Sequence, residues 1–152
     1  MPDEVILIAA VTVDGYIARH DLEITTWSKD LPLFKEQTMG FPIIMGSNTF
    51  KTMSNELVGR KSIILTRKDN PSDVLASISG KKCFVIGGGI TFRRFIGFLT
   101  HLYITPHPLV FGTGVPLFGD LHKNELQLEF KKLVEYNKNK GIFQYQYKVL
   151  KT

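Results

Sequence analysis

Cysteine is almost absent from this chain of 152 residues, which contains only Cys83. A single thiol excludes an internal disulfide framework and any metal site built from several cysteines. Because Cys83 lies in the apolar run 83–86, we interpret it as a small core residue and not as a nucleophile. The scarcity of cysteine fits the reducing cytoplasm, which is the compartment that we expect for the protein.

Long hydrophobic runs are absent as well. No stretch reaches the length of a membrane span, so no membrane partner is expected. Asp3 and Glu4 precede the first apolar run, a pattern unlike that of a signal peptide. The four histidines show no spacing typical of metal ligands, and no metal is expected.

Charge of one sign is not concentrated anywhere, although the formal net charge is +5. The basic residues are scattered, apart from short clusters such as Arg93-Arg94 and Lys131-Lys132. A balance of this kind suits small anionic molecules. No basic-aromatic motif of a known nucleic-acid module is present, so we predict a small-molecule substrate and no nucleic-acid partner.

The composition that remains is that of an ordinary globular protein, with 43% hydrophobic and 22% charged residues. We expect residues 1–152 to form a single domain with a substantial core. Apolar, β-branched runs predict buried strands at residues 5–11, 41–46, 62–67, 83–86 and 101–105. Helices are expected at 27–38, 50–53 after a cap at 47–49, 90–99 and, at most briefly, 73–78.

Two alternating segments, 127–135 and 142–150, predict a final hairpin around the turn 137–141. Strands that alternate with helices favour a mostly parallel sheet covered by helices. The predicted fold class is therefore α/β: a sandwich whose central sheet is mostly parallel and carries an antiparallel C-terminal edge hairpin.

The predicted helix 27–38 places Asp30, Phe34 and Thr38 on one face, at spacings of four residues. An apolar face that opens with a carboxylate is unusual, because a buried Asp is costly without a partner. Two interpretations remain open. Asp30 is either an exposed charge favoured by the helix dipole or a carboxylate in a cleft that awaits a cationic or hydrogen-bond-donating ligand.

Two strands end in glycine and lead into helices, at Gly46 and at Gly87-Gly88-Gly89. Such turns let backbone N–H groups approach a phosphate. The full dinucleotide fingerprint is incomplete, because Phe92 stands at the last glycine position, and a plain tight turn is the alternative. Arg67, after the third strand, is either a further anion contact or a solvated surface charge.

From Ile8 to Arg67 the chain resembles the dihydrofolate reductase family, and the match continues through 85–89 and 102–105. The residues that carry the resemblance are Ile8-Ala9-Ala10, Asp14-Gly15, Asp30-Leu31, Phe34-Lys35, Thr38, Pro42 to Gly46, Thr49, Gly59 to Leu65, Val85 to Gly89 and Leu102 to Thr105. The resemblance implies a three-layer sandwich and the reduction of 7,8-dihydrofolate to tetrahydrofolate by hydride transfer from NADPH.

The resemblance also implies roles for individual residues. Asp30 would hydrogen-bond the pterin ring of the substrate, supported by Thr105. The substrate contacts implied are Ala10, Phe34, Met53, Leu57 and Arg60, with Arg60 gripping the glutamate carboxylate in a bidentate manner. The NADPH contacts implied are Ala10 and Ile17 at the nicotinamide, Thr66 and Arg67 at the 2′-phosphate, and Gly46, Ser47, Asn48, Thr49, Ile86, Gly87, Gly88, Gly89 and Phe92 elsewhere.

The chain departs from the family pattern at several points. Ser47 stands where a basic residue is frequent, and the segment between Arg67 and Cys83 is short enough that a strand and a helix near the adenosine would be missing. Trp27 is displaced toward Asp30. The stretch 107–118 resembles instead the reductase domain of riboflavin biosynthesis, which uses NADPH on a ribosylamino-pyrimidine.

Three functions follow as alternatives. The first is dihydrofolate reduction, the second is a pyrimidine reductase of the riboflavin type, and the third is a non-catalytic nucleotide-binding module. The two resemblances also leave the assembly open between a monomer and a homodimer.

Overall fold

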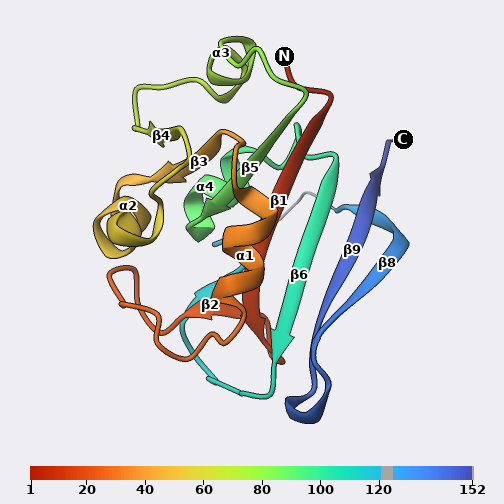
Figure 1. Cartoon of the computed structure of the whole chain (residues 1–152). Helices are drawn as coiled ribbons and strands as arrows, with labels where there is room; N and C mark the ends of the chain where they lie inside the picture. The colour runs from red at the N-terminus through yellow and green to blue at the C-terminus, as the bar shows by residue number, and fades with distance from the viewer. Residues whose placement is uncertain (121–124, 152) are drawn as a thin grey trace.

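The computed structural model describes residues 1–120 and 125–151 and has a seven-stranded sheet at its centre. In spatial order its strands are β4 (Ser62–Leu65), β3 (Ile43–Gly46), β5 (Lys82–Gly87), β1 (Glu4–Thr12), β6 (His101–His107), β9 (Ile142–Leu150) and β8 (Gln127–Asn137). Only the pairs that involve β9 are antiparallel within this sheet. The predicted mostly parallel sheet with a C-terminal antiparallel hairpin is confirmed (Figure 1).

The central strand β1 explains why the sheet forms around it. Val5, Ile6 and Leu7 are all nearly inaccessible, although successive side chains point to opposite faces. A strand buried on both faces needs cover on both, and the chain supplies it with a cluster that contains Phe34 on one side and a cluster that contains Phe92 on the other.

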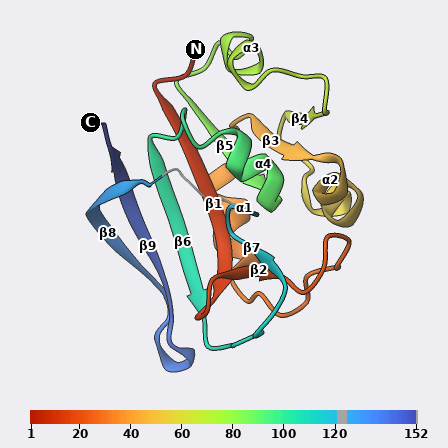
Figure 2. The same ribbon diagram turned by 180° about the vertical axis from the view of Figure 1, so that it is seen from behind.

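Four helices form the outer layers: α1 (Leu31–Thr38), α2 (Ser47–Met53), α3 (Pro71–Ala76) and α4 (Gly89–Arg94), with short 3-10 turns at Ser54–Glu56 and Lys138–Lys140. Helix α1 lies in front of the sheet in Figure 1, and α4 lies in front when the molecule is turned round in Figure 2. The sheet therefore separates two helical layers, as the three-layer prediction requires.

Helix α1 is fastened to the sheet by polar side chains as well as by its apolar face. The amide groups of Gln37 and Gln144 exchange hydrogen bonds at 2.7 and 2.8 Å, and Gln146 donates to Gln144 at 2.9 Å. Since Gln144 is buried, this pairing satisfies polar groups that would otherwise be costly. The C-terminal end of α1 is thereby held against β9.

Two predicted elements differ from the observed ones because of their position in the sheet. The strand at 62–67 was expected to be buried, but β4 is the edge strand, so Ser62 is exposed and Ile64 is 39% exposed. The helix expected at 90–99 ends at Arg94, yet Phe95 and Leu99 still pack inward from the turns that follow.

The sequence did not predict the small second sheet, in which β2 (Tyr16–Ala18) pairs with β7 (Val115–Pro116). Strands of two or three residues carry too little periodicity to be recognised. Between β4 and β5, a stretch that the structure describes completely, α3 is the only helix or strand, in agreement with the short segment noted in the sequence. In the described residues, no helix combines the length and apolar character needed to cross a membrane.

Candidate active site

A cavity of about 690 Å³ opens where the carboxyl ends of β1, β3 and β5 meet the first turns of the helices. Open α/β sheets bind ligands at this edge because glycine turns and helix N-termini converge there. The cavity wall includes the end of β1 at residues 8–10, the N-terminal half of α1 and the turn at 87–89.

Most residues that the resemblance pointed to line this single cavity. On the α1 side they are Ala10, Asp30, Phe34 and Met53. Toward the glycine turns they are Ile17, Gly46, Ser47, Asn48, Thr49, Thr66, Arg67, Ile86, Gly87, Gly88, Gly89 and Phe92. Residues that lie up to about eighty positions apart in the sequence, such as Ala10 and Phe92, therefore line the same cavity.

Asp30 lies at the N-cap of α1 but makes no capping hydrogen bond with its side chain. It is only 8% exposed, which rules out the interpretation of a solvated helix charge. Burial raises the pKa of the Asp30 carboxyl, opposed by the charge of His107 and by a hydrogen bond from Thr105. A carboxyl in such a place binds a proton more readily than one in water and can face a polar ligand.

The glycine turns are close-packed, so their lack of side chains is required. A Cβ on Gly46 would lie 2.8 Å from Thr91 Oγ1, and one on Gly89 would lie 2.8 Å from the Pro116 carbonyl oxygen. Gly87 has φ of +141°, a conformation that side-chain-bearing residues rarely adopt. Backbone thus forms this end of the cavity wall, and the turn is also packed against β7.

Replacement of Gly89 by Ala should destabilise the protein by about 1–3 kcal/mol, because the methyl group would push against backbone atoms that cannot rotate away. Gly97→Ala is the matched control, since a Cβ there meets nothing within 4 Å. Urea unfolding of both variants measures the difference. Equal stability of the Gly89 variant and the control would show that β7 moves to accommodate the methyl group at little cost in free energy.

Arg60 lies beside the cavity and does not belong to its wall. Its guanidinium donates hydrogen bonds to Thr38 Oγ1 at 2.8 Å and to the carbonyl oxygens of Glu56, Val58 and Lys35. Four of its five N–H groups are thereby engaged, counting one on Nε, two on Nη1 and one on Nη2. A bidentate grip on a carboxylate, as the sequence suggested, would require some of these bonds to break.

Leu57 also differs from its expected position. It was expected to line the benzoyl part of a substrate, but it is 4% exposed and belongs to the core cluster with Ile8 and Met45. Met53, four residues earlier, does line the cavity. Leu57 follows the 3-10 turn at 54–56, and this turn directs its side chain into the core.

The far end of the cavity contains two arginines, one of which the sequence analysis missed. Arg67 is exposed, whereas Arg94 donates hydrogen bonds to the carbonyl oxygens of Thr66 and Asp69. Arg94 is the last residue of α4, and its acceptors lie in the turn that follows β4, about twenty-five residues earlier in the chain. No local pattern could have assigned it.

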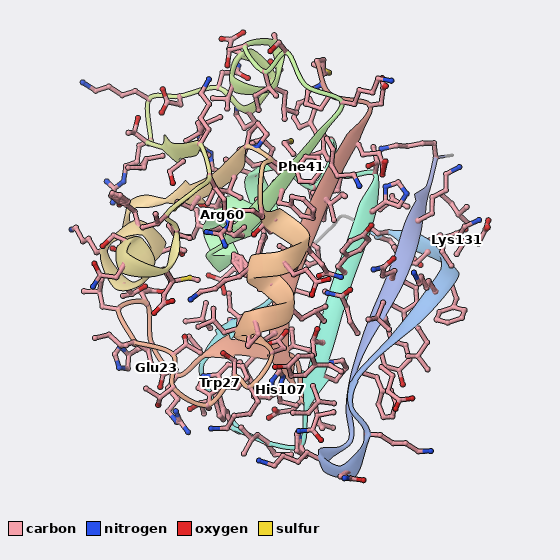
Figure 3. All side chains as sticks on the ribbon, viewed as in Figure 1. Glu23, Trp27, Phe41, Arg60, His107 and Lys131 are labelled. Atoms are coloured by element: carbon pink, nitrogen blue, oxygen red, sulfur yellow. The ribbon has the colours of Figure 1, made fainter. Side chains whose placement is uncertain are left out.

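Three further residues shape the opposite end. Trp27 and Glu23 line the cavity from the irregular segment that precedes α1, and the Trp27 indole N–H donates to Glu23 at 3.2 Å. His107 lies behind Asp30, with its Nε2 atom 3.7 Å from Asp30 Oδ1. Figure 3 shows Trp27 and His107 close together beside the lower end of α1. His107 follows Thr105 by two residues, so strand alternation could have placed it on the same face.

Comparison with known proteins agrees with this geometry. The family model described as Dihydrofolate reductase matches residues 4–151. A dihydrofolate reductase from Haemophilus influenzae is 28% identical over 143 residues, which cover 87% of each chain. One from Buchnera aphidicola is 28% identical over 81% of this chain and 82% of its own.

The solved structure of dihydrofolate reductase from Enterococcus faecalis complexed with NADP(H) and RAB-propyl has the same fold. It superposes with a TM-score of 0.75 at 19% identity and covers 98% of both chains. This likeness shows the fold, and the family match across residues 4–151 shows that the protein belongs to the dihydrofolate reductase family.

Proposed function

We propose that this protein reduces 7,8-dihydrofolate to tetrahydrofolate with NADPH in the cavity between α1 and the glycine turns. The observation that carries the proposal is the buried Asp30 carboxyl at one end of a cavity whose other end is bare backbone. NADPH, when bound, supplies the hydride. The protein must then align the substrate, exclude water and favour protonation of the substrate nitrogen.

The substrate end of the cavity suits a flat, polar ring. Asp30 would accept hydrogen bonds from the pterin ring, while Phe34 and Met53 give apolar walls to the adjoining benzoyl group. Since burial raises the pKa of Asp30, its ionised form is a strong hydrogen-bond acceptor that gains from a cationic partner. Protonation of the substrate nitrogen provides that partner.

The cofactor end suits a long anionic ligand. Close approach to the backbone is possible at Gly46 and at Gly87–Gly89, which carry no side chains, and a side chain on Gly46 or Gly89 would clash with the surrounding protein. Arg67 and Arg94 add positive charge beyond these turns, where the resemblance implies the 2′-phosphate. The residues present therefore fit NADPH, and Arg67 would take the part that a basic residue at Ser47 plays elsewhere in the family.

The pyrimidine reductase suggested by the stretch 107–118 is the weaker alternative. The relatives described above carry the dihydrofolate name, and the segment in question forms β7 with the turns around it. Monomer and homodimer both stay predictions, which sedimentation equilibrium of the purified protein distinguishes.

The deciding experiment follows NADPH absorbance with purified protein in the presence and absence of dihydrofolate. Oxidation that needs dihydrofolate and stops with an antifolate supports the proposal. Turnover with the ribosylamino-pyrimidine but not with dihydrofolate would support the alternative. Binding of NADPH without turnover of either substrate would favour the non-catalytic module.

Arg67→Leu should raise the KM for NADPH about tenfold and leave that for NADH within a factor of two, because a lost charge-assisted contact affects only the phosphorylated cofactor. Lys68→Leu is the control, since it removes the next positive charge along the chain from an exposed position. Steady-state kinetics with both cofactors provides the measurement. An equal rise in KM for NADPH and NADH would show that Arg67 does not contact the 2′-phosphate.

A further inference from the structure

His107, the last residue of β6, has no part in the roles proposed above. Its side chain is 1% exposed, so its partners are protein groups alone. The backbone N–H of Lys29 donates to Nε2 at 3.0 Å, which makes this nitrogen an acceptor. The ring proton is therefore assigned to Nδ1, which donates to the Thr105 carbonyl at 2.9 Å. Both ring nitrogens are satisfied in this way.

The same edge of the ring faces the carboxylate. Nε2 lies 3.7 Å from Asp30 Oδ1, too far for a hydrogen bond but close enough for a strong interaction once the ring carries charge. A second proton on Nε2 would release the Lys29 N–H and point a cationic N–H at Asp30. When Nε2 carries no proton, His107 accepts the hydrogen bond from Lys29, the residue before Asp30. When Nε2 is protonated, His107 can pair with Asp30 itself.

Aromatic side chains keep the ring in place. Trp27 packs edge to face with His107 at 5.4 Å between ring centroids and with Phe111 at 5.2 Å. Trp27 is itself 7% exposed, so it shields the histidine from solvent. The displacement of the tryptophan toward Asp30, noted in the sequence, is what allows this contact with the end of β6.

We propose that His107 is a positioning residue, which fixes the Lys29–Asp30 backbone and tunes how readily the Asp30 carboxylate takes a proton. The inference rests on the proposed function, because it assumes that Asp30 faces the substrate. The other ionisable groups on this side are Asp21 and Glu23, which line the cavity, Arg19, which pairs with Glu23 at 2.7 Å, and Lys29, whose ammonium donates to the Thr26 carbonyl at 3.4 Å.

Two variants separate the two parts of the role. His107→Gln retains a polar side chain that can accept from the Lys29 N–H but cannot become a cation. His107→Phe retains the ring volume beside Trp27 and removes both hydrogen bonds. The rate of hydride transfer, measured in single turnovers as a function of pH, is the first readout, because this rate falls as the substrate nitrogen loses its proton.

Both variants should move the midpoint of this fall upward by about one pH unit, because a carboxyl that can no longer pair with a cationic ring holds its proton more tightly. At low pH the Gln variant should keep the rate within about threefold of the wild type, whereas the Phe variant should lose about tenfold, a typical cost of removing a supporting hydrogen bond. NADPH affinity should stay unchanged in both.

Titration of the Asp30 carboxyl carbon by NMR in the ligand-free protein provides a second readout that needs no activity. The same upward shift is expected in both variants. If the wild type did not turn over dihydrofolate, the proposed function would be wrong. This titration would still test whether His107 changes the protonation of Asp30. Identical midpoints in all three proteins, or equal low-pH rates for Gln and Phe, would overturn the inference. If the Phe variant does not fold, the Gln midpoint decides alone.

Discussion

Asp30→Asn is expected to reduce turnover of dihydrofolate at neutral pH by about 10²–10³-fold, the range typical of a lost acid–base group. The amide can still form hydrogen bonds, but it carries no negative charge to stabilise the protonated substrate nitrogen. The residual rate should therefore rise as the pH falls, because solvent then protonates the substrate directly. NADPH affinity should remain within a factor of two.

The stability of this variant distinguishes a catalytic loss from unfolding. Burial raises the pKa of Asp30, so the folded state binds the proton more tightly than the unfolded state does. Ionisation of Asp30 consequently lowers stability as the pH rises through its folded-state pKa. Asp30→Asn removes that cost, and its melting temperature at pH 7 should equal or exceed that of the wild type.

Asp73→Asn is the matched control, since Asp73 is an exposed carboxylate in the first turn of α3. It should leave turnover and its pH dependence unchanged. Two measurements test these expectations. Stopped-flow kinetics over about pH 5–9 gives the pH dependence of turnover, and thermal unfolding followed by circular dichroism gives the stability. Undiminished turnover in Asp30→Asn at pH 7 would exclude Asp30 from the chemistry.

Arg60→Lys is expected to weaken dihydrofolate binding about tenfold or more while NADPH binding changes less than threefold, because an ammonium cannot reproduce the planar fork of the guanidinium. The structure adds a second consequence. Arg60 joins the end of α1 to the turn after α2 through Thr38, Glu56 and Val58, and lysine cannot satisfy all these acceptors. A loss of about 1–3 kcal/mol in stability should accompany the weaker binding.

Thr38→Val separates these two effects. It removes the acceptor of the 2.8 Å bond from Arg60 Nε but leaves the guanidinium charge in place. We expect lower stability and nearly unchanged dihydrofolate affinity in this variant. Calorimetric titration with each ligand and urea unfolding test the pair. If Thr38→Val weakens dihydrofolate binding as much as Arg60→Lys does, the arginine acts by holding the structure and not by contacting the substrate.

Local pattern was sufficient for the framework of the fold and for much of the cavity wall. The continuous apolar run around Ile6 predicted a strand buried on both faces, and the spacing of Asp30, Phe34 and Thr38 predicted the face that α1 turns inward. The glycines where β3 and β5 end predicted that backbone without side chains forms one end of the cavity wall. These features depend on residues near one another in the chain, where period and composition carry the information.

Only the tertiary structure decided which distant side chains meet. Arg60 was expected to grip a carboxylate of the substrate, but its guanidinium donates to acceptors in α1 and in the segment 56–58, which no spacing within one segment could show. The burial of Asp30 depends in the same way on β6, which brings His107 and Thr105 behind it from more than seventy residues away. A sequence determines which faces become buried, whereas hydrogen-bond partners and pKa values depend on what the folded chain places opposite those faces.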